Sequence, residues 1–300
     1  MATHIDEYRQ HSHWSDPGSH AVKVRAMPRD PAAIARCVSG LVTHCLSAQL
    51  MGLAVPAPAV RDVEARTVQG ILDRILARDK RPLSAARAPA VRLYGVCSHF
   101  ALLATSALRT HGIAARMRCG FAAYFLPGSL EDHWVCEYWD GAAWRLLDAQ
   151  LDEVARRVLG ITFSATDVPR DMFIDAGTAW GRLRAGAIDP SRIGIAAIGL
   201  AGDWFVGQSV LRDAAALNRA ETLPWDTWSV GRQFGPHAPD VSAETAERLD
   251  GLAHALGGIP DAAEAARVYR EREWVRMTPT ILSLEFPTGW PNGVPAEITA

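Results

Sequence analysis

The sequence predicts an α+β fold in which helices surround a small antiparallel sheet. Several long segments repeat apolar residues at the spacing of an amphipathic helix, and they flank the middle of the chain on both sides. Residues 114–150 are instead rich in aromatic and β-branched residues, as strands are. Asp140-Gly141, a two-residue turn signal, divides the second half of this stretch into a hairpin. We therefore expect an α+β core with helical additions at both ends.

The composition limits the classes of partner. The 300 residues are 49% hydrophobic, which suits one or two folded domains. The 31 Lys and Arg nearly balance 33 Asp and Glu, whereas a nucleic-acid surface needs an excess of positive charge. The longest apolar run, residues 193–202, is too short to cross a bilayer, and no signal peptide is evident. The five cysteines show no C-x-x-C spacing, so we expect a reduced, cytoplasmic protein that binds neither nucleic acid nor membrane.

The sequence predicts three regions along the chain. Residues 1–28 contain four of the ten histidines, and we expect a loosely docked arm rather than a metal site. Residues 29–165 form the core with its N-terminal helices; Asp30-Pro31 opens the first helix, with Asp30 as N-cap. Residues 166–300 are mainly helical. The other predicted helices are Val60–Asp79, Cys97–His111, Val168–Arg184, Trp204–Asn218, Ala243–Leu256 and Asp261–Trp274.

Cys97 is the candidate nucleophile because it begins a predicted helix. The unpaired N–H groups and partial positive charge of a helix N-terminus favour the thiolate. The same N–H groups can hold an oxyanion. His99 cannot serve as the base because it projects to another side of the helix, and His111 lies roughly 21 Å along it. We expect the other four cysteines to be buried structural thiols.

His133 and Asp148 are the candidate base and its orienting carboxylate. A two-residue loop at Asp140-Gly141 pairs residues whose numbers add to 281, and 133 and 148 satisfy this sum. Directly opposed residues have Cβ atoms ~4.5–5.5 Å apart, so the carboxylate would orient the imidazole. A hydrogen-bonded surface pair is the alternative reading. Together with Cys97, the pair makes the nucleophile, base and orienting group of a catalytic triad.

The three segments resemble the transglutaminase-like superfamily. The resemblance rests on residues 95–101 (GVCSHFA), 132–137 (DHWVCE) and 144–148 (WRLLD), in this order. It implies a papain-like, cysteine-protease-type core, with the nucleophile on a helix against the sheet and a triad of Cys97, His133 and Asp148. Residues 118–121, 167–171 and 223–226 extend the resemblance to bacterial transglutaminase-domain proteins. Ser98 stands where protein-crosslinking members often carry an aromatic residue, so calcium-dependent crosslinking is not expected.

Residues that could border the substrate lie on the predicted strands. Strand 114–125 alternates, with Met117, Cys119, Phe121, Ala123 and Phe125 on a core face. The opposite face could line a cleft and read an anion through Arg118, although a solvated arginine is the alternative. The 281 register also pairs Glu137 with Trp144. The expected substrate-binding residues are Arg118, Tyr124, Trp134, Glu137 and Trp144.

The expected activity is acyl transfer through a thioester on Cys97, without metal or cofactor. An amidase or peptidase, or an amide-exchanging enzyme, acting on a small or peptidic substrate is the first expectation. An acyltransferase or cyclase that takes its acyl group from a carrier-protein thioester in specialised metabolism is the second. A catalytically silent binding module with the same fold is the third.

Overall fold

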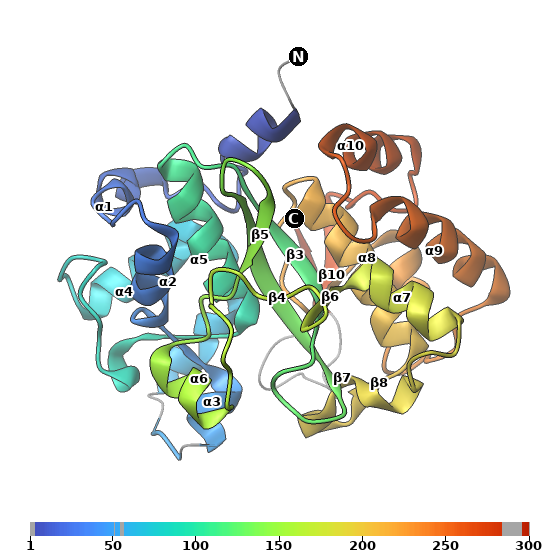
Figure 1. Cartoon of the computed structure of the whole chain (residues 1–300), viewed down its shortest axis with the longest axis horizontal. Helices are drawn as coiled ribbons and strands as arrows, with labels where there is room; N and C mark the ends of the chain where they lie inside the picture. The colour runs from blue at the N-terminus through green and yellow to red at the C-terminus, as the bar shows by residue number, and fades with distance from the viewer. Residues whose placement is uncertain (1–3, 51, 55–56, 284–295, 300) are drawn as a thin grey trace. The chain divides into compact units, whose positions relative to one another are not determined.

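A computed structural model describes residues 4–50, 52–54, 57–283 and 296–299 (Figure 1). The chain forms two compact units. The first combines residues 1–117 with 135–168, and the second combines 118–134 with 169–300. Strands β3 (Ala115–Ala122) and β4 (Leu130–Trp139) contribute residues to both units. This division differs from the three regions expected from the sequence, whose borders remain predictions.

Helix α5 (Cys97–Thr110) is the centre of the first unit, and every one of its residues is buried. It is contacted by helices α1 (Ala21–Arg25), α2 (Pro31–Ser39) and α4 (Val68–Arg78). The predicted start of α2 is confirmed, since the Asp30 side chain accepts the N–H of Ala33 and Pro31 is the first helical residue. Two further helices of this unit are short: α3 (Cys45–Leu50) and α6 (Glu153–Val158).

The predicted helix Val60–Asp79 is wrong in its first half. A 3-10 helix, η3 (Ala57–Glu64), ends before α4 begins. Thr67 causes the break because its backbone is extended and cannot continue a helix. Its side-chain oxygen caps α4 by accepting the N–H of Gly70.

The N-terminal arm is packed rather than loosely docked. It contains a 3-10 helix, η1 (His4–Arg9), and the short helix α1. The Trp14 carbonyl accepts the N–H of Val68, and the Ser15 carbonyl accepts the Ser106 hydroxyl. Ser15 is fully buried, and its hydroxyl accepts a hydrogen bond from Arg109. The arm is therefore part of the first unit's core.

The main sheet has six strands and mixed pairing, so it is larger than the small antiparallel sheet predicted. Its order is β6-β3-β4-β7-β8, with β5 (Trp144–Leu147) also paired to β4. The added strands are β6 (Phe173–Asp175), β7 (Ile193–Ile195) and β8 (Leu200–Ala201), and β7 runs parallel to β4. In the first unit, β1 (Val42–His44) and β2 (Leu93–Gly95) form a separate parallel pair.

The β4–β5 hairpin has a different register from the one predicted. Trp139 pairs with Trp144 and Cys136 with Leu147, so paired residue numbers add to 283 rather than 281. The loop contains four residues, 140–143, because one carboxylate oxygen of Asp140 accepts the N–H groups of both Ala142 and Ala143. The two-residue turn and the direct pairing of His133 with Asp148 are therefore wrong.

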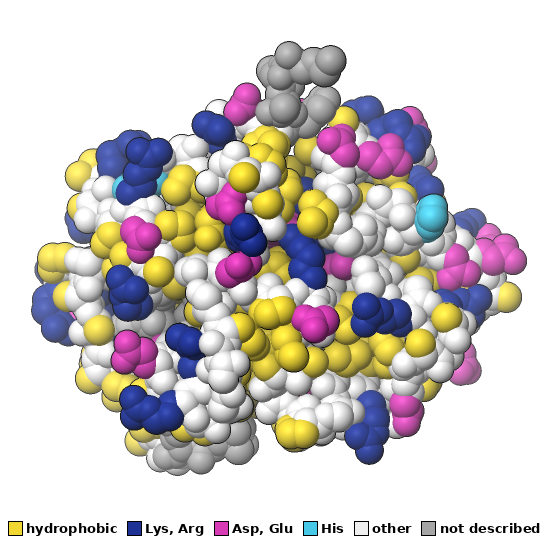
Figure 2. All heavy atoms as spheres, in the orientation of Figure 1, with side chains coloured by type: hydrophobic (Ala, Val, Ile, Leu, Met, Phe, Trp, Pro, Cys, Tyr) yellow, Lys and Arg dark blue, Asp and Glu magenta, His cyan; other side chains and the backbone are white. Residues whose placement is uncertain are grey.

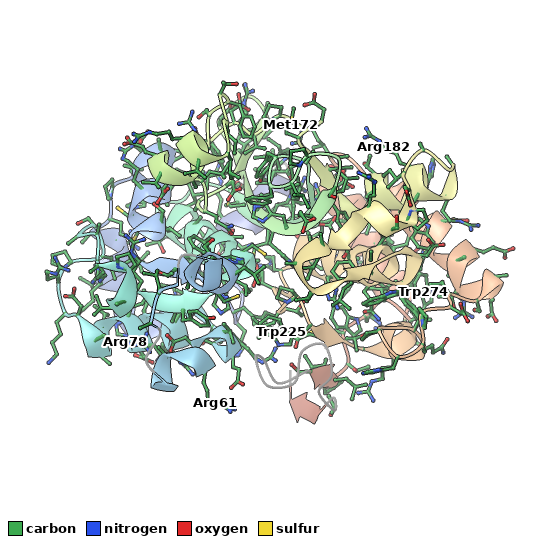
Figure 3. All side chains as sticks on the ribbon, turned by 90° about the horizontal axis from the view of Figure 1, so that it is seen from below. Arg61, Arg78, Met172, Arg182, Trp225 and Trp274 are labelled. Atoms are coloured by element: carbon green, nitrogen blue, oxygen red, sulfur yellow. The ribbon has the colours of Figure 1, made fainter. Side chains whose placement is uncertain are left out.

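Four helices pack against one another in the second unit. They are α7 (Ala176–Arg184), α8 (Asp203–Leu217), α9 (Ala243–Leu256) and α10 (Ala262–Glu271). The predicted helix Val168–Arg184 is wrong before residue 176, where β6 pairs with β3 and Asp175 then caps α7. Trp204, Trp225 (Figure 3) and Trp228 are all buried, so they belong to the core. A three-stranded sheet completes the unit, in the order β11 (Ala296–Thr299), β10 (Thr280–Ser283), β9 (Asp226–Thr227).

Candidate active site

Cys97 is the first residue of α5, as the sequence predicts, and its side chain is almost fully buried. His99 lies in the same first turn, but its Nδ1 accepts the N–H of Val96 at 3.1 Å. Burial lowers the pKa of His99 to about 4. His99 is therefore a neutral structural residue that caps the helix, which confirms that it is not the base.

The other four thiols are buried and none forms a disulfide. Burial raises the pKa of Cys45 and of Cys136 to about 12, and it also raises the pKa of Cys37. At neutral pH these three side chains remain thiols. They fit the structural role predicted for them.

Asp148 lies in the first unit, directly after β5, and is buried. Its N–H donates to the carbonyl of Ala165, and one carboxylate oxygen accepts the N–H of Gln150 at 2.9 Å. These two bonds fix the carboxylate to a local turn. In the observed register a continued ladder would place Asp148 opposite Val135, two residues from His133.

His133 lies on β4 among aromatic rings of the second unit. The rings of Tyr124, Phe125 and Phe173 stand edge-on to the imidazole, with centroids 5.9, 4.9 and 6.4 Å away. Tyr124 thus lies beside the candidate base, where the sequence placed a substrate-binding residue. The predicted alternation of strand 114–125 puts Phe125 on the core face. The strand β3 ends at Ala122, so the alternation does not extend to Phe125. No local signal in the sequence indicated Phe173.

Asp132, next to His133, is a titratable group that the sequence reasoning did not single out. Burial raises its pKa to about 6, although the positive charges of Arg212 and His133 oppose the shift. Arg212 is buried on α8, where its Nε donates to the carbonyl of Asp226. A carboxyl that titrates near pH 6 therefore adjoins the candidate base.

Arg118 has a structural role instead of the predicted role in reading a substrate anion. It is fully buried, and two of its nitrogens donate to the Asp213 carboxylate at 3.0 and 2.9 Å. A third nitrogen donates to the carbonyl of Gly258. The guanidinium therefore joins β3 to α8 and the segment after α9.

Within the first unit, Arg116 contacts both Glu137 and Trp144. Glu137 is fully buried and accepts the Arg116 Nε at 2.6 Å. The Arg116 guanidinium lies 4.3 Å from the centre of the Trp144 ring and 5.1 Å from that of Tyr8. In the observed register Glu137 pairs with Leu146, so its predicted pairing with Trp144 is wrong. The arm residue Tyr8 packs edge-on against Trp144, with ring centroids 5.6 Å apart, and Arg116 contacts both predicted substrate-binding residues.

Trp134, the last of the predicted substrate-binding residues, is buried in β4. Its indole N–H has no hydrogen-bond partner among the residues that the structure describes. A substrate contact from Trp134 remains a prediction.

Residues 61–149 match the family model of the transglutaminase-like superfamily. This segment of the chain is therefore similar to the transglutaminase-like superfamily. The match includes Cys97, His133 and Asp148. The match supports a cysteine-dependent enzyme in general terms, and it specifies neither the reaction nor the substrate.

One solved structure is similar to this chain, a "putative cysteine protease" from Cytophaga hutchinsonii. The sequences are 17% identical, the similarity covers 50% of this chain and 43% of the other, and the TM-score is 0.34. This chain therefore matches less than half the length of that protein. No curated protein matches the sequence significantly.

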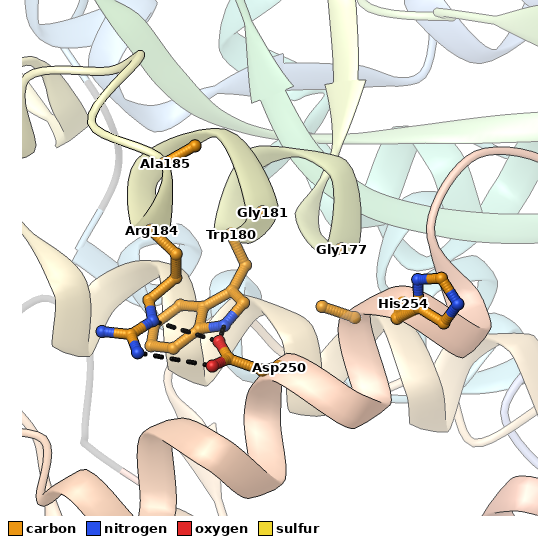
Figure 4. Close-up of a pocket in the computed structure, with 8 residues that line it drawn as sticks. Gly177, Trp180, Gly181, Arg184, Ala185, Asp250 and His254 are labelled. Carbon is orange, nitrogen blue, oxygen red and sulfur yellow. Dashed lines mark hydrogen bonds and ion pairs between the residues drawn. The ribbon is translucent and has the colours of Figure 1, made fainter.

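A hollow of about 460 Å³ lies outside the transglutaminase-like match, between α7 and α9 (Figure 4). Three of its polar side chains are paired: Asp250 accepts hydrogen bonds from the Trp180 indole at 2.7 Å and the Arg184 guanidinium at 3.1 Å. None of the predicted site residues lines it. We assign it no part in the chemistry of the transglutaminase-like core.

Within the described residues, no group of three or more His, Cys, Asp or Glu side chains could hold a metal ion. In the same part of the chain, no helix is both long and apolar enough to cross a membrane. Figure 2 shows basic and acidic side chains interspersed on the visible face.

Proposed function

We propose that the protein is an acyl-transfer enzyme that forms a thioester on Cys97. One observation carries the proposal: within the transglutaminase-like match, Cys97 occupies the first position of the buried helix α5. The partial positive charge at that helix end stabilises the thiolate, which is the nucleophilic form of cysteine. Cys45 also begins a helix, α3, but burial raises the pKa of its thiol to about 12, as it does for Cys136.

His133 and Asp148 complete the proposed triad. His133 takes the proton of the Cys97 thiol and later gives a proton to the leaving group. Asp148, whose carboxylate is already held by the Gln150 N–H, orients the imidazole and stabilises its protonated form. The aromatic rings of Tyr124, Phe125 and Phe173 restrict the orientation of His133 from the other sides.

For the reaction itself we propose hydrolysis or exchange of an amide on a small or peptidic substrate. Water as acceptor of the acyl group gives an acid, and an amine gives a new amide. Transfer from a carrier-protein thioester, including cyclisation, is the alternative acyl-transfer reaction. A silent binding module would share the fold but not the reactivity of Cys97.

A brief pulse of iodoacetamide followed by mass spectrometry tests the nucleophile. We expect Cys97 to be alkylated much faster than Cys37, Cys45, Cys119 and Cys136, because only a thiolate reacts efficiently. Acylation by p-nitrophenyl acetate should release a burst of p-nitrophenol and add an acetyl group to Cys97. Cys97→Ala should abolish both reactions, and Cys119→Ala is the matched control that should keep them. Equal labelling of all five cysteines, or a burst that survives in Cys97→Ala, would refute the proposal.

A further inference from the structure

Residues 93–96, which we call the lead-in, connect β2 to Cys97 and lie at the edge of a two-stranded sheet. One edge of β2 pairs with β1, where the Leu93 N–H donates to the Leu41 carbonyl. Within the described residues, no other strand pairs with β2. Because backbone N–H groups alternate in direction along a strand, those of Tyr94 and Val96 point away from β1. These two donors need partners from outside the sheet.

Asp62 is the partner of Tyr94. One of its carboxylate oxygens accepts the Tyr94 N–H at 3.0 Å, and Asp62 is only 2% exposed. Asp62 belongs to η3, which packs along β2. Arg78 of α4 donates two hydrogen bonds to the Asp62 carboxylate, at 2.5 and 2.8 Å, and a third to the carbonyl of Arg92 at 3.2 Å. The Asp62 carboxylate is therefore a rigid anchor for the lead-in.

His99 is the partner of Val96, the N-cap residue of α5. Its Nδ1 accepts the Val96 N–H at 3.1 Å, as the third helical residue of a capping box does, and its own N–H donates to the Val96 carbonyl at 2.9 Å. The imidazole can accept at Nδ1 only when it is neutral. Burial lowers the pKa of His99 to about 4, so the ring is neutral at every pH at which a thiolate can form.

We propose that Asp62 and His99 are positioning residues that fix Cys97 for attack on the acyl carbon. This inference rests on the proposed function. The two side chains hold alternate N–H groups of the lead-in, those of Tyr94 and Val96, and Cys97 is the next residue. They act on the reaction through the backbone, by keeping the thiol and the first N–H groups of α5 in one geometry. In that geometry the thiolate attacks, and the N–H groups hold the oxyanion that results.

Two substitutions of His99 separate the hydrogen bond from the bulk of the side chain. In His99→Gln, the side-chain oxygen can still accept the Val96 N–H, because glutamine at the third helical position forms a capping box. In His99→Leu, the buried position remains filled, but the side chain has no acceptor. Only His99→Leu leaves the Val96 N–H without this partner.

Two substitutions of Asp62 make the same comparison. Asp62→Asn and Asp62→Leu both remove the charge that pairs with Arg78, but only Asp62→Asn keeps an oxygen that can accept the Tyr94 N–H. Thr67→Ala is the control for destabilisation alone. It deletes the side-chain cap of α4 in the same unit, a hydrogen bond from the Gly70 N–H, and does not touch the lead-in.

The test compares two reactions of Cys97 in the full-length protein. Acylation by p-nitrophenyl acetate requires the thiolate and the oxyanion donors to be aligned, whereas alkylation by iodoacetamide requires only the thiolate. We measure the ratio of the two rates in one sample of each variant. We expect His99→Leu and Asp62→Leu to lower this ratio on the order of 100-fold, the loss that a misplacement of about 1 Å can cause. We expect His99→Gln, Asp62→Asn and Thr67→Ala to keep a ratio close to that of the wild type.

Three results would overturn the positioning role. A wild-type ratio in both leucine variants would make Asp62 and His99 structural only. A loss in His99→Gln and Asp62→Asn as large as in the leucine variants would mean that the hydrogen bonds to the lead-in are not the cause. An equal loss in Thr67→Ala would assign the effect to general destabilisation. A failure of the proposed function looks different, because the wild-type protein would then show no acylation that depends on Cys97.

Discussion

Trp139 and Trp144 face each other across the β4–β5 ladder, with ring centroids 5.8 Å apart and an interplanar angle of 70°. They are the last pair of the ladder before the loop of the hairpin that leads to Asp148. The observed register differs from the predicted one by two residues. Because side chains in a strand alternate with a period of two, this shift keeps each side chain on the predicted side of the hairpin. The direct opposition of His133 and Asp148 is lost, and Asp148 follows the last paired residue of β5, Leu147.

Asp148→Asn should lower kcat/KM for acylation by at least about 100-fold, since the corresponding change in a serine protease costs about 10⁴. The amide has no negative charge to stabilise a protonated His133, and it allows the wrong imidazole tautomer. Asp167→Asn is the control, because Asp167 is an exposed carboxylate that pairs with Arg145. Steady-state kinetics on both variants check this. Near-normal activity in Asp148→Asn would mean that another group orients the base.

Asp132→Asn should stabilise the protein at neutral and alkaline pH. The folded-state pKa of Asp132 is about 6, above the ordinary 3.8, so the folded protein binds this proton more tightly than the unfolded chain does. The free energy of unfolding of the wild type should therefore fall as pH rises from about 4 to about 6, and stay lower above that range. Asp132→Asn lacks this loss, so its free energy of unfolding should exceed that of the wild type by about 1–2 kcal/mol at pH 8 and should equal it at pH 4.

Urea unfolding at pH 4, 6 and 8 measures the effect of Asp132. Asp171→Asn, which removes an exposed carboxylate of the same unit, is the control. A gain from Asp132→Asn that is equal at all three pH values would contradict titration of Asp132 as the cause.

Glu137→Gln should destabilise the protein by about 3 kcal/mol, because it leaves the buried Arg116 guanidinium without its carboxylate. The rings of Trp144 and Tyr8 offset only part of this loss. Chemical denaturation measures the change. Asp140→Asn, which weakens the partly exposed Asp140–Arg145 pair, serves as the comparison and should have a much smaller effect. If Glu137→Gln lowered the free energy of unfolding by less than Asp140→Asn does, the buried pair would contribute little to stability.

Gly120→Ala should destabilise the second unit by about 2 kcal/mol or more, since overpacking forces the backbone to move. A Cβ at this position would lie 2.3 Å from the Ile174 carbonyl oxygen and 2.9 Å from the Asp175 Cα, where β6 pairs with β3. Gly181→Ala is the matched control, because the same atom there meets nothing within 4 Å. Because Gly181 lies in the interior of α7, Gly181→Ala should raise the free energy of unfolding by roughly 0.5–1 kcal/mol. Thermal unfolding of both variants checks the contrast.

The parts of the site that follow local rules could be predicted from the sequence. A helix start depends on a few adjacent residues, so Asp30 as N-cap and Cys97 at the first position of α5 could be read directly. Strand composition likewise located β4 and β5, and short motifs identified the superfamily, because such signals lie within a few positions of one another. The role of His99 also followed from helical geometry alone.

Only the tertiary structure decided the relationships between distant segments. The hairpin register depended on how the Asp140 carboxylate bonds the loop, which a turn signal does not specify. The role of Arg118 depended on Asp213, which is 95 residues away in the sequence. Such contacts form when buried charges need partners and when edge strands need neighbours, and neither requirement leaves a periodic pattern in the chain. The sequence by itself therefore determined which side chains can carry the chemistry, and long-range packing determined which groups surround them.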